Sequence, residues 1–326
     1  MAFTKFLDPK NDFLFRRLFG EERHKDLLIY FINSVLHLKG RHAVQEATYL
    51  KTIQNPEIAS KKQSIVDVLC KDQNGTQFII EMQVAKTPGF EKRAQYYASK
   101  AYIHQMNEGG LYQDLKEVIF IALTDFIMFP KKKDWKSSHV TLDKKTFEQD
   151  LKDFSFTFIE LPKFNKAIDH LETVEEKWVY FFKHGHTSSD EEIERFIGND
   201  LILRKALNVT TQYSMTEEEW NTYEQALKHE WDNRAVEQWK TMEAQVKLME
   251  AEEKGMEKGM EKGMEKGMEK GMEKGMEKGK AEGRAEGEVK KAQEIALRML
   301  KRRIPVEEII EDTGLSKEEI LALKTA

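Results

Sequence analysis

The sequence predicts an α/β fold followed by a C-terminal helical extension, and three observations support this class. Apolar runs typical of strands are mixed with helical periodicity over roughly the first 164 residues. From about residue 165 the strand signals stop, and capping-box sequences predict helix starts at Thr173, Ser189, Thr216 and Ser316. Further on, the tetrapeptide Lys-Gly-Met-Glu occurs six times between Lys254 and Glu277.

The first elements follow from local periodicity. Residues 11–38 are predicted to be helical in two pieces, because apolar residues recur at helical spacing on both sides of Gly20. Residues 43–53 are predicted to form a strand. Residues 117–124 predict a buried strand, since the apolar run does not alternate, and residues 154–161 predict another.

Residues 90–107 predict an amphipathic helix with one distinctive face. The residues along that stripe are Arg93, Tyr97, Lys100 and His104. Two interpretations remain for the stripe: it contacts a DNA backbone, or it is a mixed surface stripe.

The most informative segment is an expected hairpin. Two apolar runs, residues 65–69 and 78–82, flank the turn-like sequence Gln-Asn-Gly at 73–75. Each run contains one carboxylate, Asp67 in the first and Glu81 in the second. An unpaired carboxylate is costly to bury in an apolar strand, so a bound divalent cation is the natural compensation.

The register decides whether these carboxylates meet. A two-residue turn would place Asp67 opposite Met82, whereas a three-residue loop places Asp67 opposite Glu81, with Cβ atoms roughly 4.5–5.5 Å apart. We predict the three-residue loop, with Gly75 at positive φ, and strand alternation then puts Gln83 on the same face. The apolar neighbours expected on this face are Ile65, Leu69 and Ile79. The alternative is a surface hairpin whose polar residues face water.

These residues resemble the motif of the PD-(D/E)XK nuclease superfamily and, within it, the Rpn family of recombination-promoting nucleases and transposase-like proteins. Asp67 matches the first acid, Glu81 the second, and Gln83 the position usually held by lysine. The opening segment, residues 8–20, is also similar to the start of Rpn proteins. The resemblance implies a restriction-endonuclease-like core, a mixed sheet flanked by helices.

The resemblance also implies an activity. It implies a DNA endonuclease of recombination or transposition that leaves a 5′-phosphate. Mg²⁺ would be bound by Asp67, Glu81 and the backbone carbonyl of Met82. The catalytic residues would be Asp67, Glu81 and Gln83. Gln83 does not titrate in the useful range, so it would orient water or donate to a phosphate oxygen rather than act as a base. The alternative is a non-catalytic DNA-binding or assembly protein that keeps the fold. Asp12 or Arg16 of the opening helix would face the pocket, or Asp12 simply favours the helix dipole.

Composition limits the other functions. The net charge is −5, yet residues 1–100 contain 16 basic and 11 acidic residues, whereas residues 161–250 contain 11 and 18. The basic bias therefore coincides with the motif, as phosphate binding requires. The single cysteine, Cys70, excludes an intrachain disulfide and fits a reducing compartment. With no signal-like start and no long apolar run, we expect a cytoplasmic protein without a membrane segment.

We expect four segments: a nuclease-like core at 1–164, a helical region packed on it at 165–230, a long repeat-containing helix at 231–300 and a helix-turn-helix-like module at 301–326. Each repeat glycine costs about 1 kcal/mol of helix stability relative to alanine, so the repeat is a marginal helix in isolation. It either self-associates as a coiled-coil-like homo-oligomer or serves as a flexible spacer. The last module either binds DNA or serves dimerisation or self-regulation. The residues expected to pack on it are Ile295, Leu297 and Leu300.

Overall fold

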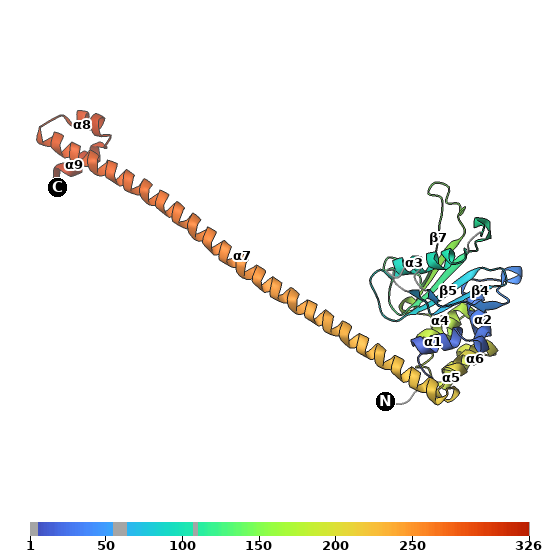
Figure 1. Cartoon of the computed structure of the whole chain (residues 1–326). Helices are drawn as coiled ribbons and strands as arrows, with labels where there is room; N and C mark the ends of the chain where they lie inside the picture. Colours follow the sequence, from blue (N-terminus) through green and yellow to red (C-terminus); the bar gives the residue numbers. More distant parts are fainter. Residues whose placement is uncertain (1–5, 55–63, 107–109, 326) are drawn as a thin grey trace. The chain divides into compact units, whose positions relative to one another are not determined.

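A computed structural model describes residues 6–54, 64–106 and 110–325, in two units, Met1–Arg234 and Ala235–Ala326, each described here by itself (Figure 1). The first unit confirms the predicted α/β class, because a mixed sheet of six strands lies between helices. The strands of this sheet are β1 (Ala47–Tyr49), β4 (Val68–Asp72), β5 (Gln77–Gln83), β6 (Val118–Thr124), β7 (Lys136–Val140) and β8 (Phe154–Glu160).

The strand order is β1-β4-β5-β6-β8-β7. The central strands β5, β6 and β8 run parallel, and the outer pairs β1–β4, β4–β5 and β7–β8 are antiparallel. The crossover that parallel β5 and β6 require contains the helix α3 (Phe90–Ile103). A separate two-stranded ladder joins β2 (Ile53–Gln54) to β3 (Ser64–Ile65).

The predicted strands at 117–124 and 154–161 are confirmed as β6 and β8. The strand predicted over 43–53 is wrong in extent, because only the short β1 and β2 form there. The helix predicted over 90–107 ends at Ile103, and residue 107 lies outside the described residues.

The first unit has six further helices in the described ranges, counting the start of α7. These are α1 (Asp12–Phe19), α2 (Lys25–Val35), α4 (Val174–His184), α5 (Asp190–Ile197), α6 (Leu201–Val209) and α7 (Glu217–Lys301). Short 3-10 turns lie at Glu22–His24, Gly40–His42, Tyr112–Asp114, Leu161–Lys163, Ile168–His170 and Gln212–Ser214. The predicted break at Gly20 is confirmed, since α1 ends beside it. The capping boxes at Thr173, Ser189 and Thr216 start α4, α5 and α7 as predicted.

Each face of the sheet is covered by a different apolar layer. Helix α3 covers one face, and its Phe90 packs in a cluster with Leu69, Ile79, Phe120 and Phe158. Helices α1, α2 and α4 cover the other face (Figure 1). The aromatic side chains at the centre of that second cluster are Phe15, Phe19, Phe31, Trp178 and Phe182. Because both faces are buried, the central strand β6 is apolar and buried throughout.

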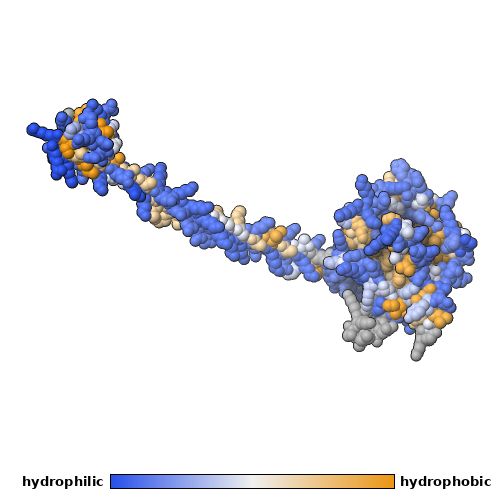
Figure 2. Space-filling model, turned by 90° about the horizontal axis from the view of Figure 1, so that it is seen from above, coloured by the Kyte–Doolittle hydropathy of each residue, from blue (hydrophilic) through white to orange (hydrophobic). Residues whose placement is uncertain are grey.

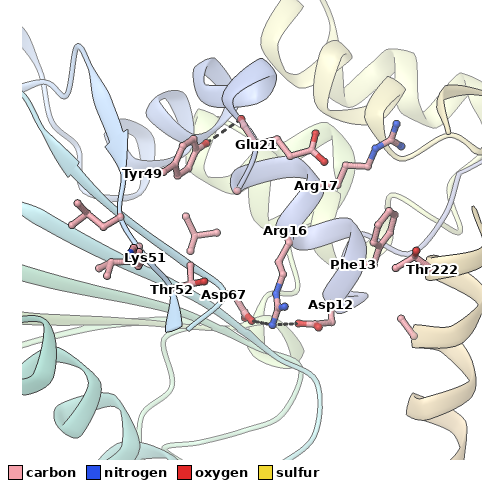
Figure 3. Close-up of a pocket in the computed structure, with 15 residues that line it drawn as sticks. Asp12, Phe13, Arg16, Arg17, Glu21, Tyr49, Lys51, Thr52, Asp67 and Thr222 are labelled. Carbon is pink, nitrogen blue, oxygen red and sulfur yellow. Dashed lines mark hydrogen bonds and ion pairs between the residues drawn. The ribbon is translucent and has the colours of Figure 1, made fainter. Parts of the chain in front are cut away.

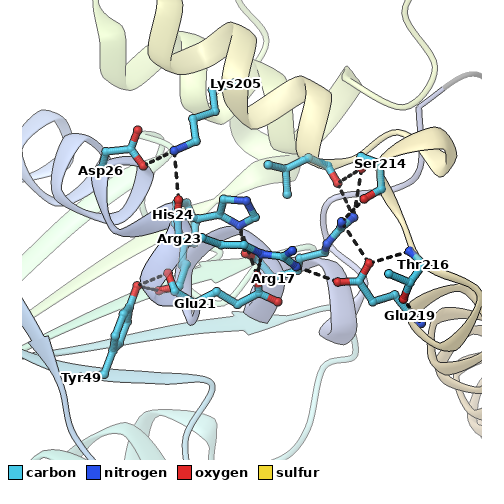
Figure 4. Close-up of polar contacts among 12 residues, drawn as sticks. Arg17, Glu21, Arg23, His24, Asp26, Tyr49, Lys205, Ser214, Thr216 and Glu219 are labelled. Atoms are coloured by element: carbon cyan, nitrogen blue, oxygen red, sulfur yellow. Dashed lines mark hydrogen bonds and ion pairs between the residues drawn. The ribbon is translucent and has the colours of Figure 1, made fainter.

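A buried arginine ties α1 to the start of α7 (Figure 4). The side chain of Arg17 is 3% exposed and forms an ion pair with Glu219 at 3.2 Å. Its guanidinium also donates to the carbonyl oxygens of Val209, at 2.9 Å, and of Ser214. Arg23 reaches the same Glu219 carboxylate at 2.7 Å from an exposed position. The segment that leads into α7 is thus held against α1 by charge-assisted hydrogen bonds.

The second unit contains most of α7 and two short helices, α8 (Val306–Thr313) and α9 (Lys317–Thr325). Gly314, at φ 69°, separates α8 from α9, and the Ser316–Glu319 capping box starts α9 as predicted. The residues at the centre of its small core are Ala296, Ile309, Leu315 and Ile320. The packing predicted for α7 is partly wrong: Leu300 contacts this core, but Ile295 and Leu297 are exposed. The helical stripe through Ala292, Ala296 and Met299 faces inward instead, and Ile295 and Leu297 lie beside it.

The repeat is helical in a single chain, and its methionines are exposed along a mostly hydrophilic surface (Figure 2). A Cβ added at any glycine from Gly255 to Gly279 would meet open space. Nothing among the described residues therefore requires glycine there, and self-association of this helix stays a prediction. No helix in the described ranges combines the length and the apolar character needed to cross a membrane.

We expect the loop between β4 and β5 to need glycine at position 75. Gly75 has φ 88°, where a β-branched residue is strained by about 1–2 kcal/mol and asparagine is tolerated better. Gly75→Val should therefore lower the free energy of unfolding by at least ~1 kcal/mol more than Gly75→Asn. Urea unfolding followed by tryptophan fluorescence measures both, and equal losses would contradict the assigned backbone conformation.

Loss of the Arg17 contacts should destabilise the first unit. Arg17→Ala removes the charge-assisted hydrogen bonds to the Val209 and Ser214 carbonyls and leaves Glu219 without its buried cation, so we expect a loss of about 2–3 kcal/mol in the free energy of unfolding. Arg23→Ala is the matched control, because its exposed ion pairs contribute at most about 1 kcal/mol. Urea midpoints that fall equally for the two variants would argue against a special role for the buried arginine.

Candidate active site

The predicted hairpin register is confirmed. Residues 68–71 of β4 pair with residues 80–77 of β5, which leaves a three-residue loop at 73–75 with Gly75 at positive φ. Leu69 and Ile79 lie in the apolar layer under α3, on the face that strand alternation assigns to Asp67 and Glu81. The side chain of Ile65, predicted for the same face, lies outside the described residues.

The first acid interrupts its strand rather than lying within it. We expected one apolar strand through 65–69, but β3 ends at Ile65 and β4 begins at Val68, with a bend at Asp67. Side-chain bonds replace the ladder there: the Asp67 N–H donates to Glu81 Oε1 at 3.1 Å, and the Met82 N–H donates to Asp67 Oδ2 at 3.0 Å. This exchange brings the two carboxylates together.

The second acid is the most buried of the predicted site residues. Glu81 is 3% exposed and has no ion pair within 4.0 Å in the described part of the chain. Its Oε2 accepts a hydrogen bond from Gln83 Nε2 at 3.1 Å. Gln83 in turn accepts one from Arg93 of α3. The structure thus brings Asp67, Glu81 and Gln83 into one hydrogen-bonded chain.

Helix α1 adds a cation on the other side of Asp67 (Figure 3). The Arg16 guanidinium lies 3.2 Å from Asp67 Oδ1 and 3.3 Å from Asp12 Oδ1. Asp12 and Arg16 therefore both face the site. Helix α1 begins at Asp12 because Asn11 caps it, accepting from the Phe13 N–H at 3.1 Å.

Two hollows border these groups. One, of about 530 Å³, is lined by Asp12, Arg16, Tyr49 and Asp67, among others (Figure 3). The other, of about 580 Å³, is lined by Lys10, Asp12 and Met82. Both extend to the first turns of α7, where their shared lining residues are Thr222 and Ala226. Asp67 is therefore reached from an open groove, whereas Glu81 lies behind it and lines neither hollow.

Burial and mutual repulsion disfavour the charged forms of the two acids. Burial is the main cause that raises the pKa of Asp67 to about 6, and the nearby Asp12 charge adds to it, although the Met82 N–H and Arg16 oppose it. Burial, followed by the Asp67 charge, raises the pKa of Glu81 well above its ordinary value. Arg16 and Arg93 therefore offset only part of the negative charge that the two acids would carry together.

The donor set fits a hard divalent cation. Each of the four carboxylate oxygens accepts a single protein hydrogen bond, so each keeps a lone pair for a metal. Among the described residues no group of three His, Cys, Asp or Glu side chains could hold an ion. Two carboxylates suit Mg²⁺, which keeps several waters and needs few protein ligands.

Sequence reasoning missed two features of the site. Arg93 was predicted to lie on a stripe that either contacts a DNA backbone or is a mixed surface stripe, and the hydrogen bond from its guanidinium to Gln83 was not predicted. Sequence reasoning also gave no role to Thr222 and Ala226, which line both hollows. The alanine-rich face of α3 beside Arg93 was a usable signal for the contact with Gln83. The lining by Thr222 and Ala226 could not be predicted, because no local pattern reveals a contact between segments about 150 residues apart.

A mixed sheet in which two acids and a polar side chain meet at the end of one hairpin is the arrangement expected of PD-(D/E)XK nucleases. The chain belongs to the PD-(D/E)XK nuclease family transposases, whose family model matches residues 9–239. This match confirms the resemblance found in the hairpin and the opening segment, and nucleases of this class generally use divalent metal ions. Searches of curated proteins and of solved structures gave no match.

The acid pair should make the metal-free protein less stable as pH rises. Asp67 binds its proton more tightly in the folded chain, so its contribution to stability is full below its ordinary pKa of 3.8 and is lost as pH rises through about 6. In EDTA at pH 7.5, we expect Asp67→Asn to raise the melting temperature by about 2–4 °C, which corresponds to ~1 kcal/mol. At pH 4.5 the gain should shrink.

Glu46→Gln is the control for this measurement, because Glu46 is exposed and lies before β1. It should leave the melting temperature unchanged at both pH values. A lower melting temperature for Asp67→Asn at pH 7.5 would contradict the repulsion between the two acids.

Proposed function

We propose that this protein is a Mg²⁺-dependent DNA endonuclease that hydrolyses phosphodiester bonds in recombination or transposition. The observation that carries the proposal is the convergence of Asp67 and Glu81, both with raised pKa values, beside an open groove. The family supports a nuclease-like, transposase-related role, and DNA is the substrate that such a role implies.

In this proposal Asp67 and Glu81 hold the ion, together with the backbone carbonyl of Met82. The N–H and the carbonyl of one residue in a strand point to the same side, and the Met82 N–H points to Asp67, which supports a place for the carbonyl beside the two acids. The ion, when bound, polarises the phosphodiester and makes water more acidic.

The remaining residues position the reactants. Gln83 has no proton to exchange near neutral pH, so its amide orients the attacking water or donates to a phosphate oxygen. Its orientation is defined, because its Nε2 donates to Glu81 and its Oε1 accepts from Arg93. Arg16 balances the charge of Asp67 and Asp12 at the edge of the groove.

A second function remains open because Gln83 stands where the motif usually has lysine. A non-catalytic DNA-binding or assembly protein would keep the fold and the long helix without cleaving. Self-association through α7 and a cytoplasmic location belong to either proposal.

The decisive experiment is plasmid nicking by the full-length chain with and without Mg²⁺. We expect cleavage only with the metal and a loss of about 100-fold or more for Asp67→Ala and for Glu81→Ala, since a metal contributes several kcal/mol of transition-state stabilisation. Glu46→Ala, an exposed acid outside the site, should cleave like the wild type.

Two results would change this assignment. Cleavage that survives both Asp67→Ala and Glu81→Ala in folded protein would refute the endonuclease site. Absence of cleavage by the wild type with every divalent ion tried, despite DNA binding, would favour the non-catalytic protein.

A further inference from the structure

Arg93 lies in an unusual environment beside the site. It is half-buried on α3, and its guanidinium carbon lies 4.8 Å from the ring centroid of Phe90 and 6.0 Å from that of Tyr97. One terminal nitrogen, Nη2, donates to Gln83 Oε1. The aromatic rings hold the guanidinium by cation–π contacts and limit its rotation.

Arg93 keeps its positive charge available, unlike Arg16. Arg16 is balanced by two carboxylates, Asp12 and Asp67. Within the described ranges, Arg93 has no carboxylate within 4.0 Å, and its only side-chain hydrogen bond goes to a neutral amide. In the described part of the chain this guanidinium therefore has no direct ion pair, although its charge acts on the Glu81 carboxylate from beyond contact distance and opposes the rise that burial causes in the pKa of that acid.

The hydrogen-bond donors of Arg93 are also incompletely used. Its Nε is buried and has no hydrogen-bond partner in the described part of the chain. Buried donors without partners are rare, and each calls for an explanation such as a missing ligand or ion. A guanidinium offers Nε and Nη donors in a planar fork that matches the oxygens of a phosphate.

We propose that Arg93 forms an anion subsite that binds a phosphate group of the nucleic acid next to the acid pair. The assignment of that phosphate to DNA rests on the proposed function, whereas anion binding by Arg93 does not. The subsite explains how a polyanion approaches two carboxylates: Arg93 offers the attraction that Arg16, already paired, does not.

Arg93 has a second effect through Gln83. The Gln83 amide is held between a donor, Arg93, and an acceptor, Glu81, so its oxygen and nitrogen cannot exchange places without losing both bonds. A phosphate bound at Arg93 would thus lie beside an amide with fixed orientation. A purely structural Arg93 would hold Gln83 but would not change the electrostatics of DNA binding, and this difference is measurable.

The test is the binding of a fluorescein-labelled DNA duplex by the full chain in EDTA, followed by anisotropy at several salt concentrations. One phosphate contact contributes about 0.9 to the slope of log K against log salt. We expect Arg93→Gln to weaken binding several-fold and to reduce this slope by about 0.9. Arg93→Lys, which keeps the charge, should retain the wild-type slope.

Lys92→Gln is the matched control, because Lys92 is the exposed neighbour on α3 and loses the same charge. Its slope should equal that of the wild type. If Arg93→Gln does not fold, Arg93→Met repeats the charge loss while keeping apolar contact with the two rings. A folded variant without charge at position 93 that binds with the wild-type affinity and slope would overturn the subsite.

This outcome is separable from failure of the endonuclease proposal, because binding in EDTA requires no cleavage. If the wild type never cleaves but Arg93→Gln lowers the slope of log K against log salt, the protein has the subsite and lacks the activity. If the wild type cleaves but the Arg93 variants bind DNA with the wild-type affinity and slope, the protein has the activity and lacks the subsite.

Discussion

The site depends on one exchange of hydrogen bonds between a bend and a strand. The Asp67 N–H binds the Glu81 carboxylate, and the Met82 N–H binds the Asp67 carboxylate. These bonds replace the backbone ladder where β4 has not yet begun, so two acids that would repel each other are held side by side. Backbone donors lower the cost of burying the charges but do not remove it, as the raised pKa values show. The arrangement is therefore stable enough to form and remains short of positive charge.

The helices on the two faces of the sheet each bring one arginine to the site, and the two arginines have different partners. Helix α1, which packs on one face of the sheet, sends Arg16 to Asp67 and balances it with a second acid, Asp12. The Arg93 side chain of helix α3, which covers the other face, donates to the neutral Gln83 and has no carboxylate within ion-pair distance in the described ranges, so it acts on Glu81 only from farther away. Arg16 thus neutralises part of the negative charge of the site, whereas Arg93 is the arginine that we propose attracts an anion. This difference follows from the partner of each guanidinium, because the two side chains are chemically identical.

Helix α7 contains both the turns that border the site and the repeat. The first turns are held by contacts with α1, whereas the repeat has an exposed surface. The first turns of α7 are held by the Arg17–Glu219 contacts (Figure 4). Thr222 and Ala226 of the same turns line both hollows. Beyond Arg234, the repeat glycines each weaken the helix by about 1 kcal/mol, and the repeat methionines are exposed among the residues that the structure describes. Association with another copy would bury these methionines and stabilise the helix, and this is the physical basis of the proposed self-association.

Local chemistry allowed the sequence to specify much of this protein. The Gln-Asn-Gly loop with Gly75 in the left-handed region sets the register that brings Asp67 opposite Glu81, and the capping boxes start α4, α5 and α7 where they were predicted. These features depend on a few neighbouring residues, so they could be read without the fold. The bend at Asp67, the contact of Arg93 with Gln83 and the inward stripe of α7 through Ala296 could not. Each of these depends on which surfaces meet across the chain, and only the packing of distant segments decides where a long polar side chain finds its partner.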